Sequence, residues 1–307
     1  MPKKFKLVMI SAMYENGGNT LQRHLDGHPE LYVYPFESQP GTFMVQDFLT
    51  SLFPQKYRWP EFGISGDTGR DYEMIIDEEF KVRVNTPHVS KFRHVSDLGC
   101  TNADRKKVFL RLMKGKARTR ANLMEAFYRS TFEAWKTRKN SGREIVYVGY
   151  SPIIGVDSDK IIADFPDSII LHIVRNPYAA YAETKRRPVP YTLSRYTRTW
   201  NIMQLAALNF AGQYPKNVVV VRFEDMVADK VGFFRKLSKT LGIRYSDTMT
   251  YPSWNGKKLD HQYPWGTIEI PTEKANRETT NELNRSEREL ISSQSGVINK
   301  ALGYDKL

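Results

Sequence analysis

Residues 6–26 read KLVMISAMYENGGNTLQRHLD, and this stretch decides the fold. Its apolar start predicts a strand, the paired glycines Gly17 and Gly18 predict a turn, and the remainder predicts a helix capped by Asn19 or Thr20. Backbone N–H groups of such a turn can approach an anion closely, and the start of a helix favours negative charge. The turn therefore predicts an anion site, without the Gly-Lys-Ser/Thr ending of a nucleoside triphosphatase loop.

Three later runs share the apolar, β-branched character of the first one. The four predicted strands cover residues 6–11, 145–150, 169–174 and 218–223. Apolar residues at three- and four-residue steps, or a glycine stop, predict helices over 20–26, 121–139, 196–214, 230–241 and 282–302. Strands that alternate with helices predict an α/β fold with a mainly parallel central sheet flanked by helices.

Two stretches lack this alternation. Residues 41–119 are irregular and rich in aromatics, Pro and Gly, and residues 248–281 read as a loop. We interpret them as a cap and a closing loop of one domain that covers 1–307, because such segments commonly form pocket walls above a sheet. The cap residues expected to line a pocket for an acceptor are Phe43, Phe48, Trp59 and Phe62.

The formal net charge of +12 favours an anionic partner such as nucleic acid, anionic lipid or a phosphorylated small molecule. No helix-turn-helix, zinc-finger or RNA-binding signature is visible, which argues against nucleic acid. Apolar runs such as 169–174 are too short to span a bilayer. The single cysteine, Cys100, and an N-terminus without a signal-peptide pattern predict a cytoplasmic protein.

Three segments carry a family resemblance. They are LQRHLDGHPELYVYP at 21–35, IILHIVRNPYAAYAETKRR at 169–187 and VVVVRFEDMVAD at 218–229. In order and spacing they resemble the segment after the 5′-phosphosulfate loop, the 3′-phosphate segment and a later strand end of sulfotransferases that depend on 3′-phosphoadenosine 5′-phosphosulfate (PAPS). The resemblance implies a P-loop-like three-layer fold with PAPS as donor and adenosine 3′,5′-bisphosphate as product.

The resemblance also implies which residues bind the donor. Arg175 would hold the 3′-phosphate with Arg187 as a second basic contact, and Phe223 would lie near the nucleotide. Glu183 aligns with a family serine, and the adjacent Thr184 could supply the hydroxyl. The predicted loop residues are Tyr14, Glu15, Asn16, Gly17, Gly18, Asn19 and Thr20.

Glu15 stands where the family turn carries Lys or Arg. A carboxylate there would repel a phosphosulfate, so either Glu15 points away or another cation compensates. Lys257 and Lys258, which follow the turn dipeptide Asn255-Gly256, are the candidates for that cation.

An acceptor hydroxyl must lose its proton as it attacks sulfur, and a carboxylate or imidazole can take it. Several sulfotransferase branches place a glutamate where Glu37 lies, and the neighbouring Tyr34 and Phe36 could raise its pKa by desolvation. Other branches use a histidine, for which His88 and His94 are the candidates.

The sequence therefore predicts a PAPS-dependent sulfotransferase that acts on a hydroxyl of a small or medium-sized acceptor. No metal is needed, and no Cys/His cluster has zinc spacing. Two alternatives stay open: a non-catalytic module that binds adenosine bisphosphate, and a P-loop-type kinase or hydrolase. Nucleic acid and a membrane span are not expected, and a homodimer is left open.

Overall fold

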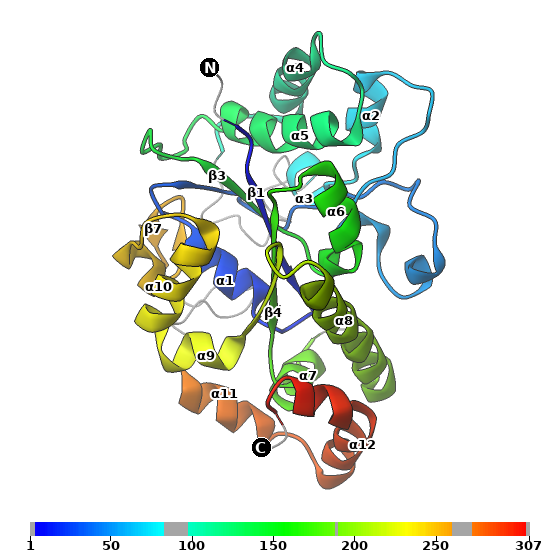
Figure 1. Ribbon diagram of the computed structural model, residues 1–307, viewed down its shortest axis with the longest axis vertical. Coiled ribbons are helices and arrows are strands. Elements are labelled where there is room, and N and C mark those ends of the chain that lie inside the picture. Colours follow the sequence, from blue (N-terminus) through cyan, green and yellow to red (C-terminus); the bar gives the residue numbers. More distant parts are fainter. Residues whose placement is uncertain (1–3, 83–97, 188–189, 260–271, 305–307) are drawn as a thin grey trace.

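The computed structural model describes residues 4–82, 98–187, 190–259 and 272–304. Its centre is a parallel sheet in the order β2-β3-β1-β4-β5 (Figure 1). The strands are β1 (Leu7–Ala12), β2 (Leu31–Val33), β3 (Val146–Tyr150), β4 (Ile169–Val174) and β5 (Val218–Arg222). The predicted α/β class with a parallel sheet is confirmed.

Helices follow the strands and fill the connections between them. The α-helices of the first half are α1 (Gly18–Leu25), α2 (Thr68–Met74), α3 (Glu78–Lys81), α4 (Asn102–Met113) and α5 (Arg120–Ala134). Those of the second half are α6 (Ser158–Asp164), α7 (Pro177–Lys185), α8 (Leu193–Gln213), α9 (Phe223–Ala228), α10 (Lys230–Leu241), α11 (Glu273–Thr280) and α12 (Arg285–Ala301). Short 3₁₀ turns are η1 (Phe48–Ser51), η2 (Gln55–Tyr57), η4 (Ile154–Asp157) and η5 (Asp247–Thr250), and a small hairpin joins β6 (Ser253–Trp254) to β7 (Lys257–Lys258).

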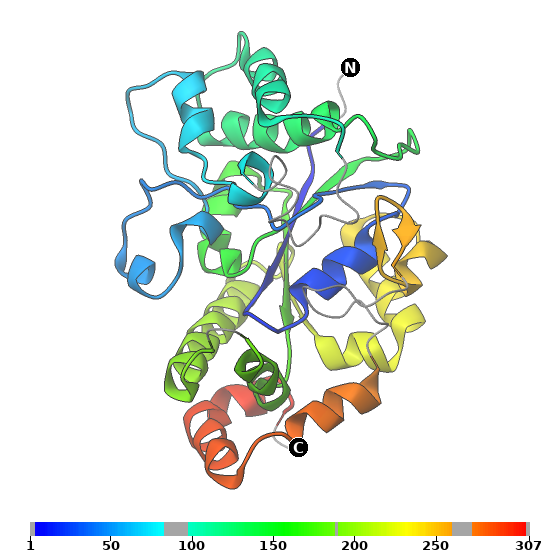
Figure 2. The same cartoon turned by 180° about the vertical axis from the view of Figure 1, so that it is seen from behind.

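The two faces of the sheet explain why its strands are apolar throughout. Successive side chains of a strand point to opposite faces, so Leu7 and Met9 pack into one core and Val8 and Ile10 into another. Residues of α5 and α6 belong to the first core, and residues of α1 and α10 belong to the second. This is the predicted three-layer arrangement, and Figure 2 shows the same layers from behind. In the ranges described above, no helix combines the length and the apolar character needed to cross a bilayer.

The predicted cap of α1 was wrong. The helix begins at Gly18, and the capping position is Gly17 with φ 91° in the left-handed region. Asn19 and Thr20 therefore lie inside the first turn of α1. Glycine adopts this backbone conformation at little steric cost, which is why the turn ends earlier than the polar residues indicated.

The segment predicted to be irregular, 41–119, contains α2, α3 and α4. α4 packs on α5 through Phe109 and Met113, a pattern hidden in the sequence by the basic residues between them. The expected acceptor-pocket aromatics separate, since Trp59 is fully buried whereas Phe43 and Phe48 are 70% and 80% exposed. The other aromatic, Phe62, is partly buried against the core.

Residues 248–281, predicted to be a loop, also contain regular structure. The β6–β7 hairpin packs against α1, and α11 packs against α7 and α9. Both α7 and α9 begin directly beside predicted donor-binding residues, so α11 lies close to that region (Figure 1).

Candidate active site

The turn after β1 is fixed by the side chain of Asn16, which is fully buried. Its Oδ1 accepts hydrogen bonds from the Arg175 backbone N–H at 2.9 Å and from Trp200 Nε1 at 3.2 Å. Its Nδ2 donates to the Tyr14 carbonyl at 2.9 Å and to the Tyr196 hydroxyl at 3.2 Å. One amide thus ties the turn to the end of β4 and to α8, which explains why the sequence places Asn at this position.

Gly17 and Gly18 allow aromatic rings to approach the turn. A Cβ on Gly17 would lie 2.4 Å from Cδ2 of Phe223, and one on Gly18 would lie 2.4 Å from Cε2 of Tyr150. Gly17, at the capping position of α1, has no side chain, and among the described residues no side-chain hydrogen bond caps the first-turn N–H groups, which suits them to an anion or to water. The turn therefore has the geometry that an anion site needs.

Arg175 follows β4 and is only 8% exposed. Its Nε donates to Asn276 Oδ1 at 2.7 Å, its Nη1 to the Glu15 carbonyl at 3.2 Å, and its Nη2 lies 3.6 Å from Glu183 Oε1. The guanidinium also lies over the Phe223 ring, 4.9 Å from its centre. The structure therefore brings Arg175, Glu183, Phe223 and the turn into one corner at the carboxyl ends of the strands. A guanidinium beside free helix N–H groups and an aromatic ring fits a phosphorylated nucleoside.

Glu15 is neutralised by Arg187, whose Nε lies 3.1 Å from Glu15 Oε1 and whose guanidinium lies over the Tyr14 ring. Arg187 is therefore a cation beside the turn, in addition to Arg175. Lys257 and Lys258 form β7 and directly follow Gly256 in the sequence. The Gly256 N–H donates to Asp26, which lies at the carboxyl end of α1, away from the turn. The structure does not bring these two lysines to the turn.

Thr184 is fully buried in α7, and its hydroxyl donates to the Ala180 carbonyl at 3.0 Å. This hydroxyl satisfies a backbone carbonyl of its own helix. Its neighbour Glu183 is the α7 side chain that reaches Arg175.

Glu37 is half-buried and lies beside the turn. Its Oε2 accepts a hydrogen bond from the Tyr57 hydroxyl at 2.9 Å, and the Tyr57 ring packs edge-on against that of Tyr14. Burial, with a smaller contribution from the Glu37 charge, raises the pKa values of Tyr14 and Tyr57. The Tyr57 phenol therefore stays protonated and acts as a donor. Tyr57 was missed in the sequence because it lies in the cap, 20 positions from Glu37, with no motif around it.

The histidines divide into two groups. His88 and His94 lie outside the described residues. His172 is buried in β4, where it bonds Ser11 Oγ at 3.1 Å and Gln204 Oε1 at 2.7 Å. Burial lowers the pKa of His172 to about 4, so it is neutral and structural, as is expected of a histidine inside an apolar strand.

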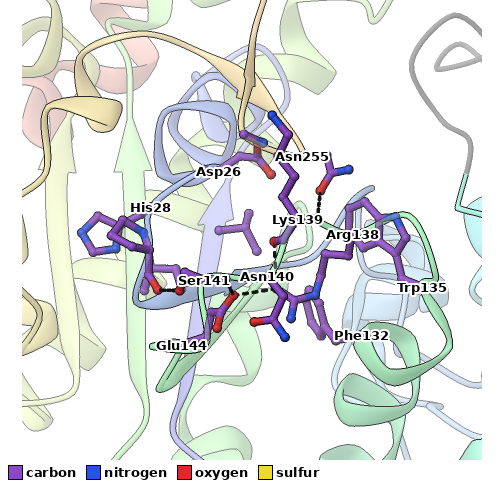
Figure 3. Close-up of a pocket in the computed structure, with 15 residues that line it drawn as sticks. Asp26, His28, Phe132, Trp135, Arg138, Lys139, Asn140, Ser141, Glu144 and Asn255 are labelled. Carbon is purple, nitrogen blue, oxygen red and sulfur yellow. Dashed lines mark hydrogen bonds and ion pairs between the residues drawn. The ribbon is translucent and has the colours of Figure 1, made fainter.

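A hollow of about 250 Å³ lies at the carboxyl end of α1, away from the turn after β1 (Figure 3). Asp26, Arg138, Glu144 and Asn255 are among the side chains around it. Arg138 Nη1 donates to Glu144 Oε1 at 2.9 Å, and the Lys139 backbone N–H donates to Asn255 Oδ1 at 2.8 Å. These bonds join loops to one another.

Among the residues that the structure describes, no cluster of three or more His, Cys, Asp or Glu could hold a metal ion.

Comparison with known proteins agrees with this geometry. The family model described as "Sulfotransferase family" matches residues 17–247. The sulfotransferase domain from the curacin biosynthetic pathway aligns over 96% of this chain and 98% of its own, at 15% identity and a TM-score of 0.55. The sulfotransferase domain of the Synechococcus PCC 7002 olefin synthase aligns over 95% of both chains, at 14% identity and a TM-score of 0.52.

At these identities the solved structures show a shared fold. No curated protein matches the chain. The family model, however, spans well over half of the sequence and includes Gly17, Arg175 and Phe223. The chain belongs to the sulfotransferase family.

Proposed function

We propose that this protein transfers a sulfuryl group from PAPS to a hydroxyl of a small or medium-sized acceptor, as a cytoplasmic biosynthetic enzyme. The observation that carries the proposal is the joint placement of Asn16, Arg175 and Glu37 around one turn. Asn16 fixes the turn to the strand end that bears Arg175, and Glu37 reaches the same turn through Tyr57 and Tyr14. Donor and base groups therefore share one edge of the sheet, where ligands bind in open α/β folds.

The donor would be held by groups of this chain in three places. The uncapped N–H groups at the start of α1 suit the phosphosulfate, and the Arg175 guanidinium suits the 3′-phosphate. Phe223 offers an aromatic surface beside both. Asn276, the hydrogen-bond partner of Arg175, lines a cavity of about 730 Å³ together with Asn176 and Glu224, and this volume is in the range of small-molecule sites.

Glu37 would act as the general base. Its carboxylate takes the proton of the acceptor hydroxyl while the hydroxyl oxygen forms a bond to sulfur. The bond between sulfur and the bridging oxygen breaks, and its electron pair leaves on the phosphate of adenosine 3′,5′-bisphosphate. The N–H groups of the α1 turn stabilise this charge. The protonated Tyr57 fixes one oxygen of Glu37 and so orients the carboxylate.

The test is incubation with ³⁵S-labelled PAPS and a panel of alcohols, phenols and sugars, followed by chromatography of labelled esters. Wild-type protein should yield labelled product, and Glu37→Gln should retain binding of the bisphosphate while losing turnover. Bisphosphate binding without product from any acceptor, and with no difference between the two proteins, would favour a non-catalytic binding module.

A further inference from the structure

The edge of the Arg175 guanidinium that suits an oxyanion, formed by Nε and Nη2, faces other side chains of the protein. Nε and Nη2 of a guanidinium form the fork that binds an oxyanion through two parallel hydrogen bonds. Here Nε donates to Asn276 Oδ1 at 2.7 Å, and Nη2 lies 3.6 Å from Glu183 Oε1. An amide oxygen and a carboxylate oxygen thus occupy the two positions that a phosphate would fill. Asn276 is itself 7% exposed, so α11 covers this edge of Arg175.

Both occupants have a second partner nearby. Asn276 Nδ2 donates to Glu224 Oε1 at 3.2 Å, and Glu183 Oε2 lies 3.2 Å from Arg186 Nη1. Glu224 keeps other donors if Asn276 leaves, because the Asn176 backbone N–H bonds Oε1 at 3.0 Å and the Tyr304 hydroxyl bonds Oε2 at 2.7 Å. Departure of Asn276 would therefore leave the half-buried Glu224 carboxylate with hydrogen-bond donors, so the main cost of breaking such a contact is avoided.

The part of the α11 attachment that the structure describes is polar. Among the α11 side chains that the structure describes, the buried ones are Asn276 and Thr279, and neither is apolar. Helices held by few buried apolar contacts open at low free energy. The cavity of about 730 Å³ lies directly beside Asn276 and Glu224, between α9, α11 and α12, so Asn276 borders open space.

We propose that α11 is a latch on the phosphate-binding arginine: Asn276 holds the Arg175 fork in the free protein, and the 3′-phosphate of the donor displaces it. This inference rests on the proposed function. Asn276 is then a competitor of the phosphate, and it lowers the affinity for nucleotides that carry a 3′-phosphate. Nucleotides without this phosphate leave the latch closed.

The experiment is calorimetric titration of wild type and Asn276→Ala with two probes, adenosine 3′,5′-bisphosphate and adenosine 5′-monophosphate. The variant should bind the bisphosphate about tenfold more tightly, the effect of one lost charge-assisted hydrogen bond, and the monophosphate equally well. Lys274→Ala is the matched control, since the Lys274 side chain is 85% exposed, lies 3.7 Å from Glu278 of its own helix and does not line the cavity. It should leave both affinities unchanged.

Hydrogen exchange of wild-type protein gives a second measurement that needs no variant. The α11 amides should exchange faster with the bisphosphate bound and should not respond to the monophosphate. Unchanged or weaker bisphosphate binding by Asn276→Ala, or slower α11 exchange, contradicts the latch and leaves the proposed function standing. Absence of bisphosphate binding in both proteins contradicts the proposed donor, and the latch with it.

Discussion

The two ends of α1 both lie beside ionic side chains, and they differ in how these side chains are paired. At the amino end, Arg175 and Arg187 contact Glu183 and Glu15 at 3.6 and 3.1 Å, and the capping position of the helix, Gly17, makes no side-chain hydrogen bond. At the carboxyl end, Asp26 is 4% exposed, and its Oδ2 accepts bonds from Ser253 Oγ at 2.9 Å and Gly256 N–H at 3.0 Å.

The difference separates the proposed binding site from a structural junction. At the carboxyl end, Asp26 joins α1 to the β6–β7 hairpin through hydrogen bonds from Ser253 and Gly256. At the amino end, the proposed function requires that an anion replace the present partners of Arg175. A hollow lined by charges is therefore not sufficient evidence of function, and the pairing of those charges carries the information.

The largest expected effect is that of Glu37→Gln at the amino end. Loss of a general base lowers kcat by about 10²–10⁴-fold, whereas the affinity for adenosine 3′,5′-bisphosphate should hardly change. Steady-state kinetics and calorimetry together measure both quantities. The control is Glu30→Gln at the opposite edge of the sheet, where Glu30 accepts the Arg244 backbone N–H at 2.9 Å. Equal loss of kcat in both variants would contradict the difference between the two ends.

Gly17→Ala should have the second-largest effect. Alanine at φ 91° is strained, and its Cβ would lie 2.4 Å from Phe223, so we expect a loss of about 2–4 kcal/mol in the free energy of unfolding and weaker nucleotide binding. Gly142 near the carboxyl end of α1 has φ 74° with no atom within 4 Å of an added Cβ. Gly142→Ala should therefore show the smaller backbone cost alone, about 1 kcal/mol, with binding intact. Urea denaturation measures the free energy of unfolding of both variants. Equal losses in Gly17→Ala and Gly142→Ala would contradict the predicted clash with Phe223.

Asp26→Asn should have the smallest effect. Burial raises the pKa of Asp26 above 3.8, with Arg23 opposing it, so the folded state holds this proton more strongly than the unfolded state. The Asp26 contribution to stability is thus full below pH 3.8 and is lost as pH rises through the raised pKa. Asp26→Asn should reduce the dependence of the free energy of unfolding on pH, measured by urea unfolding at several pH values, and should leave kcat unchanged. A steeper slope, or a loss of kcat, would contradict the structural role.

Much of the sheet was predictable because its strands are buried on both faces. β4 and α10 have the predicted bounds, β3 and β5 are one residue shorter at one end, and β1 is shifted by one residue at both ends. β2 is only three residues long, too short to give a run, and α4 was hidden by its basic residues. Local patterns thus revealed the strands whose burial is continuous and missed a strand that is too short and a helix whose buried residues are separated by charges.

The candidate site was predictable where a residue follows directly from a strand or a turn. Arg175, Gly17 and Phe223 lie at such positions, and the structure brings them together. Asn276 and Tyr57 were not predictable, because each reaches the site across a long sequence separation, 101 residues from Asn276 to Arg175. No local pattern encodes such contacts. Lys257 and Lys258 were predicted from their charge and from the turn dipeptide before them, whereas the ion pair of Glu15 is with Arg187.

The central claim is that the amino end of α1 binds the donor through Arg175. Calorimetric titration of wild type and Arg175→Ala with adenosine 3′,5′-bisphosphate tests it, with Arg138→Ala at the carboxyl end as the control. We expect micromolar binding by wild type, a loss of about 100-fold in Arg175→Ala, and unchanged affinity in Arg138→Ala. No binding by wild type, or equal binding by all three proteins, would contradict the claim and leave a sulfotransferase fold with a different ligand.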